Sequence, residues 1–220
     1  MWCIPTLNKE YIERMEHLLE LYGLVPNPNE PLVCMDEKSK QLLRDTRASL
    51  SMKEGKTKRT DYEYKRNGTR NIFLAVAPHE GQRFCSVTLR RTKKDFAQFI
   101  RALLTKHYPH TKKIHLVCDN LNTHFPSSFF EAFPKTEAKR LLKRIVFHYT
   151  PKHASWLNMA EIELSVLSSQ CIKGRVPTEQ ILGEKMAQWE RARNTTHTKI
   201  QWKFTVADAR KKFKYKTELS

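Results

Sequence analysis

Two short apolar runs, each followed by an aspartate, constrain the fold of this chain more than any other feature of its sequence. Residues 32–35 form an uninterrupted apolar run that ends at Asp36, and the mostly apolar residues 114–118 end at Asp119. Runs of this length are typical of central strands that are buried on both faces. The carboxyl ends of neighbouring strands in an open α/β sheet meet at one crevice, so adjacent strands would bring both aspartates into one site.

Helix and strand patterns alternate along the rest of the chain. Apolar side chains recur at helical spacing over residues 8–22, with Asn8 as the expected N-cap, and residues 25–29 form a linker rich in Pro and Asn. Further strands are expected at 71–77, 83–89 and 145–149, and helices at 93–107, 129–143 (interrupted at Pro134), 158–172, 178–193 and from Thr205. This alternation predicts an α/β fold with a mixed sheet flanked by helices.

Basic residues outnumber acidic ones by 40 to 23, and the formal net charge of +17 favours a polyanionic partner, most often nucleic acid. They gather in three groups: Lys53, Lys56, Lys58, Arg59, Lys65, Arg66 and Arg70; Arg90, Arg91, Lys93 and Lys94; and Arg210, Lys211, Lys212, Lys214 and Lys216. Residues 51–70 are polar and lack apolar periodicity, which indicates an exposed loop or an irregular hairpin. We favour phosphate contact over a merely solvated surface for the first two groups, and leave both interpretations open for the third.

Several classes of protein are excluded. No run approaches the ~18 apolar residues that a membrane span needs, and the N-terminus has neither a basic start nor an apolar signal segment. The five cysteines are scattered and contain no C-x-x-C pair, so neither a zinc ribbon nor a thioredoxin-type site is supported. We therefore expect a cytoplasmic protein with reduced thiols and no membrane partner.

Two aspartates at one crevice repel each other, and a divalent cation relieves that repulsion. Ligation by oxygen alone suits Mg²⁺ or Mn²⁺. A third carboxylate would come from Glu161 or Glu163 on the helix that follows Pro151. Positions two apart on a helix are ~200° apart around its axis, so only one of the two can face the site, and the apolar pattern does not choose between them. Glu37 is a weaker candidate, because neighbouring strand residues point to opposite faces.

Three segments around these acids carry a resemblance to a known family. Residues 33–38, 119–124 and 148–163, the last of them long and unusual in composition, resemble the DDE transposases of the mariner superfamily, in the branch carried by bacterial insertion sequences. The resemblance extends over nearly all of residues 1–210. It implies a ribonuclease-H-like fold, organised as an N-terminal helix and linker at 1–30, a DDE catalytic domain at 31–197 and a basic C-terminal segment at 198–220.

The resemblance also assigns the acids. It implies a two-metal centre in which Asp36, Asp119 and Glu161 are the catalytic and metal-binding residues, holding two Mg²⁺ ions for which Mn²⁺ can substitute. Residues 157–161 match the register of a Leu-Asn-Pro-x-Glu run in eukaryotic relatives, which favours Glu161 over Glu163. The interval between the second and third acids is wider than in that branch, so Glu163 stays open.

The implied function is metal-dependent cleavage of DNA at transposon ends and strand transfer into target DNA. Candidate DNA-positioning residues are Lys38, Asn120, Asn122, His124, Lys152, His153 and Trp156. For His124 and His153, hydrogen bonding within a loop is an equal alternative, and Trp156 is more often a core anchor. The resemblance implies assembly as a homodimer on paired DNA ends. Relatives also carry a helix-turn-helix region, and we expect either that another reading frame supplies that region here or that this copy is truncated. We expect a bacterial, nucleoid-associated protein.

Two rival functions come from other classes. Residues 55–57 (Gly-Lys-Thr) resemble the end of a P-loop, but the pattern requires Gly at position 50, where Leu50 stands. We discount an ATPase for that reason. The second rival is a decayed or repurposed DNA-binding protein without catalysis, which the presence of all three acids argues against.

Overall fold

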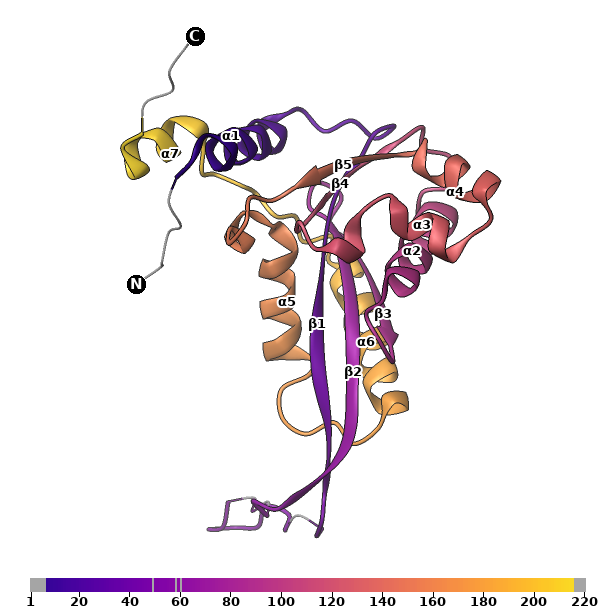
Figure 1. The fold of residues 1–220 in the computed structure, drawn as a ribbon. Helices are drawn as coiled ribbons and strands as arrows, with labels where there is room; N and C mark the ends of the chain where they lie inside the picture. Colours follow the sequence, from indigo (N-terminus) through magenta and orange to yellow (C-terminus); the bar gives the residue numbers. More distant parts are fainter. Residues whose placement is uncertain (1–6, 49, 58, 60, 216–220) are drawn as a thin grey trace.

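A five-stranded mixed sheet forms the centre of the molecule, with helices on both of its faces (Figure 1). The computed structural model describes residues 7–48, 50–57, 59 and 61–215. The strand order is β3-β2-β1-β4-β5, with bounds Leu32–Asp45 (β1), Tyr64–Ala77 (β2), Gln82–Thr88 (β3), Ile114–Cys118 (β4) and Ile145–Tyr149 (β5). The first three strands pair antiparallel, whereas β4 and β5 run parallel to β1. The predicted mixed sheet flanked by helices is confirmed.

Two apolar clusters cover the two faces of the sheet. One cluster joins the sheet to α1 (Lys9–Gly23), α5 (Met159–Gln170), α6 (Glu179–Thr195) and α7 (Val206–Phe213). The other joins it to α2 (Lys93–Ala102), the π-helical turn η1 (Leu103–His107), α3 (Ser127–Ala132) and α4 (Lys135–Leu142). Strand β1 serves both: Cys34 belongs to the first cluster, and Val33 and Met35 belong to the second. This alternation is what a strand between two helical layers requires.

Strand β1 is the main departure from the sequence prediction. It extends to Asp45 and not to Met35, so Asp36 lies within the strand and not after its end. The apolar run stops because the parallel partner β4 stops: β4 pairs with only residues 32–34, while β2 continues to pair with β1 out to Asp45. Beyond Asp36 the strand is largely half-buried or exposed, and this patterning does not register as an apolar run.

The chain between β1 and β2 forms a hairpin arm that extends well beyond the helices (Figure 1). Antiparallel bridges join Leu50 to Arg59 and Lys53 to Lys56, which confirms the irregular hairpin expected there. The strand expected to begin at residue 71 begins already at Tyr64. Gly55, with φ +69°, lies in the turn between Lys53 and Lys56, so the P-loop-like residues form a hairpin tip and start no helix.

The helices agree closely with the sequence patterns. Asn8 caps α1 by accepting the Tyr11 N–H, and Thr205 caps α7 in a capping box with Asp208. In the described part of the chain no helix is both long and apolar enough to span a bilayer. Cys34, Cys85, Cys118 and Cys171 are free thiols, while Cys3, Lys58 and Lys216 lie outside the described residues. The domain boundaries near residues 30 and 197 stay predictions.

Candidate active site

The two strand aspartates lie level with each other on adjacent parallel strands. Cys34 of β1 pairs with Val117 of β4, and Asp36 and Asp119 each follow two residues later. Asp119 comes directly after the last residue of β4, so both acids stand at the carboxyl edge of the parallel part of the sheet. The expectation that the two strands are adjacent is confirmed, and the shared register is what brings the acids together.

Asn158 and Glu37 N–H hold the Asp36 carboxylate. Asn158 caps α5, and its Nδ2 lies 3.4 Å from Asp36 Oδ2, while the N–H of Glu37 donates to Asp36 Oδ1 at 2.7 Å. Burial and, to a smaller extent, the negative charges of Glu161, Asp119 and Glu37 raise the pKa of Asp36 to about 7, although the hydrogen bond from the Glu37 N–H opposes this rise. The negative charges of Asp119 and Glu161, the two proposed partners of Asp36, therefore both act on its carboxylate.

Asp119 is held by His124, and His124 also contacts Glu37. The buried imidazole donates from Nδ1 to Asp119 Oδ1 at 2.6 Å and from Nε2 to Glu37 Oε1 at 2.9 Å. Burial lowers the pKa of His124, but the hydrogen bonds and charges of the two carboxylates outweigh this and raise it to about 9. Burial raises the pKa of Asp119, yet the contacts with His124 leave it below its ordinary value. The imidazole is thus a cation between two carboxylates.

Glu161 and Glu163 occupy different environments on α5. Glu163 is buried, and its Oε1 accepts from Arg83 Nη2 at 2.6 Å and from Arg193 Nη2 at 2.9 Å. Arg83 is itself fully buried. Glu161 lies exposed in the first turn of α5, where its charge acts on Asp36. Glu163 therefore serves a core ion cluster, whereas Glu161 is the one of the two acids whose charge acts on Asp36.

The three acids are the type of ligand that a divalent cation prefers, but their side chains are not arranged around a common point in this structure. Three carboxylates from β1, β4 and α5 supply the oxygen ligands that Mg²⁺ and Mn²⁺ prefer. Burial is the main cause of the raised pKa of Asp36, and repulsion by the other acids adds to it; a bound cation relieves both effects. Within the described ranges, no group of three or more His, Cys, Asp or Glu side chains is close enough to hold a metal ion as it stands. Asp119 is turned instead towards His124.

The candidate DNA-positioning residues divide into two sets. The first set is exposed: Lys38, Asn120, Asn122, Lys152 and His153. Of these, Asn120 directly follows Asp119, and Lys38 lies two residues beyond Asp36 on the same face of β1.

The second set, His124 and Trp156, is engaged inside the protein. The bonding of His124 favours the loop-stabilising interpretation. Trp156 lies 5.8 Å from Phe204 and 6.1 Å from Phe213 between ring centroids, and stacks against Trp202 at 6.5 Å. These contacts favour its interpretation as a core anchor that ties the C-terminal segment to the loop before α5.

Sequence reasoning did not predict the contacts that several residues make at this site. Asn158 could have been found as the N-cap of the predicted helix, since Asn in that position is a recognisable start signal. Glu37 does point away from Asp36, as expected, but it reaches His124 on that face. The charge of Arg91, from the second basic group, contributes to the lowered pKa of Asp119, although the contacts with His124 contribute more. Burial raises the pKa of Tyr149 at the end of β5, and the charge of Arg14 of α1 partly opposes this rise.

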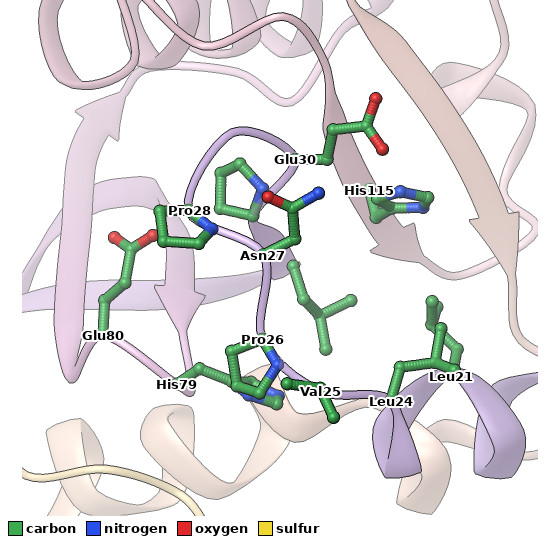
Figure 2. Close-up of a pocket in the computed structure, with 12 residues that line it drawn as sticks. Leu21, Leu24, Val25, Pro26, Asn27, Pro28, Glu30, His79, Glu80 and His115 are labelled. Atoms are coloured by element: carbon green, nitrogen blue, oxygen red, sulfur yellow. The ribbon is translucent and has the colours of Figure 1, made fainter.

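A cavity of about 600 Å³ lies away from this site, between the end of α1, the following linker and the β2–β3 turn (Figure 2). Leu32 and His115, at the beginnings of β1 and β4, line it together with His79 and Glu80. It therefore opens at the amino edge of the parallel strands, opposite to the edge that carries Asp36 and Asp119.

A family described as DDE superfamily endonuclease matches residues 31–182. This range contains Asp36, Asp119 and Glu161 and all five strands. No match was found among the curated proteins.

Solved structures of Mos1 complexes share the fold. The chain matches the Mos1 mariner paired-end complex with Mn at a TM-score of 0.58 and 14% identity, covering 90% of this chain and 60% of that one. It matches the Mos1 transposase paired-end complex with the left transposon end at a TM-score of 0.60 and 14% identity, covering 94% of this chain and 64% of that one. It matches the Mos1 strand transfer complex at a TM-score of 0.59 and 11% identity, covering 90% of this chain and 59% of that one. The chain thus spans about 60% of the length of these chains, and the expected ribonuclease-H-like fold is confirmed.

Proposed function

The chain belongs to the DDE superfamily of endonucleases, and from that premise we propose that it is the catalytic part of a DNA transposase. It would cleave DNA at transposon ends and transfer the ends into target DNA. Both reactions displace an oxygen from a phosphodiester, with water as the nucleophile in the first and a DNA 3′-hydroxyl in the second. One site can therefore serve both.

The observation that carries this proposal is the shared register of Asp36 and Asp119. Two buried-strand acids reach the same edge of the sheet because Cys34 pairs with Val117, and the charge of Glu161 acts on Asp36 from α5. Such a set of like charges is unfavourable for folding and is kept where a function requires it.

Asp36, Asp119 and Glu161 would hold two Mg²⁺ ions, or Mn²⁺ in their place. When bound, these ions would activate the attacking oxygen and stabilise the leaving oxygen of an in-line displacement. The surrounding residues orient the ligands. Asn158 fixes Asp36 relative to the start of α5, and His124 fixes Asp119.

The basic groups would bind the DNA backbone on both sides of the acids. Arg90 and Arg91 are exposed, and the charge of Arg91 already reaches Asp119. Lys53, Lys56 and Arg59 are exposed on the hairpin arm, where a long duplex extending from the site could meet them. Phosphate contacts of this kind release counterions, so affinity should fall steeply as salt rises.

Finer parts of the identity stay predictions. These are the bacterial insertion-sequence branch, assembly as a homodimer on paired ends, a separately encoded helix-turn-helix region and a cytoplasmic, nucleoid-associated location. The Mos1 structures were solved as complexes of paired ends and of strand transfer, which supports DNA as the partner proposed here.

A nicking assay on supercoiled plasmid DNA tests the proposal. The wild-type chain should nick with Mg²⁺ or Mn²⁺, and both Asp119→Asn and Glu161→Gln should abolish nicking while DNA binding persists. Glu184→Gln, an exposed change on α6 that removes the same charge as Glu161→Gln, is the matched control and should nick normally. Undiminished nicking by Asp119→Asn would reject the assignment, and salt-sensitive DNA binding without nicking by the wild type would favour the non-catalytic alternative.

A further inference from the structure

A cavity of about 490 Å³ adjoins the acids on the side of α1. It lies between the first two turns of α1, the loop after β5 and the residue that follows Asp119, and is lined by Asn8, Glu10, Tyr11, Arg14, Asn120, Pro151, Lys152 and His153. Three of these, Asn120, Lys152 and His153, are residues for which the sequence already predicts DNA positioning. They come from two loops, and α1 completes the cavity with side chains that the sequence did not single out.

The cavity adjoins the site through Asn120, and the charge of Arg14 in its lining acts on a residue that is hydrogen-bonded to the site. Asn120 is adjacent to Asp119 in the chain, and Tyr149, which feels the charge of Arg14, donates its hydroxyl to the carbonyl oxygen of His124 at 3.1 Å. His124 in turn holds Asp119. A group bound in the cavity would therefore lie next to a phosphodiester held at the acids.

The lining has the polarity of a nucleotide site. Arg14 and Lys152 bring two positive charges from different elements, of which Glu10 offsets one through its 2.8 Å ion pair with Arg14. Asn8, Asn120 and His153 add hydrogen-bonding groups, and Pro151 adds an apolar surface.

Tyr11, in the lining of the same cavity, has a buried hydroxyl group without a hydrogen-bond partner among the described residues. Its side chain is 5% exposed, and its Oη finds no hydrogen-bond partner among the described residues. Burial raises the pKa of this phenol, and nearby Trp156 lowers it without reaching hydrogen-bond geometry. A buried hydroxyl without a partner costs free energy unless a ligand satisfies it.

We propose that this cavity binds a single unpaired nucleotide next to the scissile phosphate, with Arg14 and Lys152 on its phosphate and Tyr11 donating to its base or sugar. A cavity of this size holds one nucleotide and is too small for a duplex, so its occupant is unstacked from the helix. This inference rests on the proposed function, because it places the cavity's occupant beside a bound DNA strand. It assigns to α1 a role in substrate binding.

Equilibrium binding in EDTA tests the inference separately from cleavage. The probes are a short fluorescent DNA duplex with blunt ends and the same duplex with one unpaired nucleotide at a 3′ or a 5′ end. We expect the full chain to bind one of the overhanging duplexes about tenfold more tightly than the blunt one. Arg14→Ala and Lys152→Ala should each remove most of that preference, and Tyr11→Phe should reduce it about threefold.

Two further variants sharpen the result. Glu10→Gln should strengthen the preference, because Arg14 loses its competing carboxylate. Arg140→Ala removes the same charge as Arg14→Ala from an exposed position on α4 and should leave the preference unchanged. Thermal melting of each variant shows whether it is folded, and Lys152→Ala, an exposed loop change, keeps the test valid if a change in α1 unfolds the chain.

The outcomes separate this inference from the proposed function. Equal affinity for blunt and overhanging duplexes, with normal nicking, overturns the nucleotide cavity and leaves the transposase proposal intact. A preference that Arg14→Ala and Lys152→Ala do not alter also overturns it. A wild-type chain that prefers the overhang but does not nick contradicts the catalytic proposal alone, and a chain that binds no DNA contradicts both.

Discussion

The side-chain amide of Asn158 lies 3.4 Å from Oδ2 of Asp36, and the same Nδ2 donates to the carbonyl oxygen of Met35 at 2.8 Å. Its Oδ1 accepts the N–H of Ala160 at 3.1 Å and so caps α5. One buried side chain therefore fixes the strand that carries Asp36 relative to the helix that carries Glu161.

Replacing Asn158 should separate its two roles. Asn158→Asp keeps an oxygen that can cap α5 but removes the donor to Met35 and adds a negative charge beside Asp36. We expect metal-dependent nicking to fall on the order of 10- to 100-fold, as for other residues that orient metal ligands. Thr205→Ala is the matched control, since it removes the cap of α7 at a cost of about 1 kcal/mol without touching the site. Full nicking by Asn158→Asp would contradict the positioning role.

Glu163→Gln should destabilise the protein far more than Glu161→Gln. The change leaves Arg83 buried without its counter-charge, which costs on the order of 3 kcal/mol. Glu161 is exposed, and its neutral variant should stay within about 0.5 kcal/mol of the wild type. Urea denaturation measures both free energies of unfolding, and equal values for the two variants would show that the ion cluster with Arg83 and Arg193 is not what holds α5.

His148 should make the protein sensitive to acid. It is buried in β5 between His17 of α1 and His115 of β4, at 2.8 Å and 2.9 Å from their ring nitrogens. Burial, together with the charges of His17 and His115, lowers the pKa of His148 to about 4. The unfolded chain, with a histidine pKa of about 6.5, therefore binds a proton first as the pH falls.

The sign of the effect follows from that difference. The contribution of His148 to stability is fully present above pH about 6.5 and is lost as the pH falls towards 4, by up to about 3 kcal/mol. Urea unfolding of the wild type and of His148→Gln at several pH values isolates this contribution from that of the carboxylates. Parallel curves for the two proteins over this range would refute the prediction.

Trp156→Ala decides between the two interpretations of this residue. As a core anchor it packs on Trp202, Phe204 and Phe213, so its loss should lower the free energy of unfolding by about 3 kcal/mol. The folded fraction should still bind DNA within about twofold of the wild type. If stability is unchanged but affinity drops by an amount typical of a lost base stack, on the order of 10-fold, Trp156 contacts DNA instead.

Much of the fold was predictable because local signals determine it. The caps at Asn8 and Thr205 and the break at Pro134 define helix ends within the chain itself, and these ends are confirmed. The length of β1 was not predictable from its apolar run, because its second half is stabilised by pairing with β2 and not by burial on both faces. A half-exposed strand of this kind has no continuous apolar signature.

The sequence allowed the acids of the site to be predicted, but not the side-chain contacts that hold them. Asp36 and Asp119 follow recognisable runs, but the bond from His124 to Glu37 joins residues on separate elements, and only the folded sheet brings them together. The choice between Glu161 and Glu163 depended likewise on where Arg83 lies, on a strand 80 positions away from Glu163. Contacts of this kind leave no periodic trace in a sequence.

Anomalous scattering from crystals soaked with Mn²⁺ tests the central claim most directly. The claim is that Asp36, Asp119 and Glu161 share divalent cations, and it predicts Mn²⁺ peaks with carboxylate oxygens of all three residues at about 2.1 Å. His124 should then keep its contact with Glu37, while the Asp119 carboxylate reorients towards the cation. Mn²⁺ bound elsewhere, with the three carboxylates on separate surfaces and none of them in contact with the ion, would contradict the account.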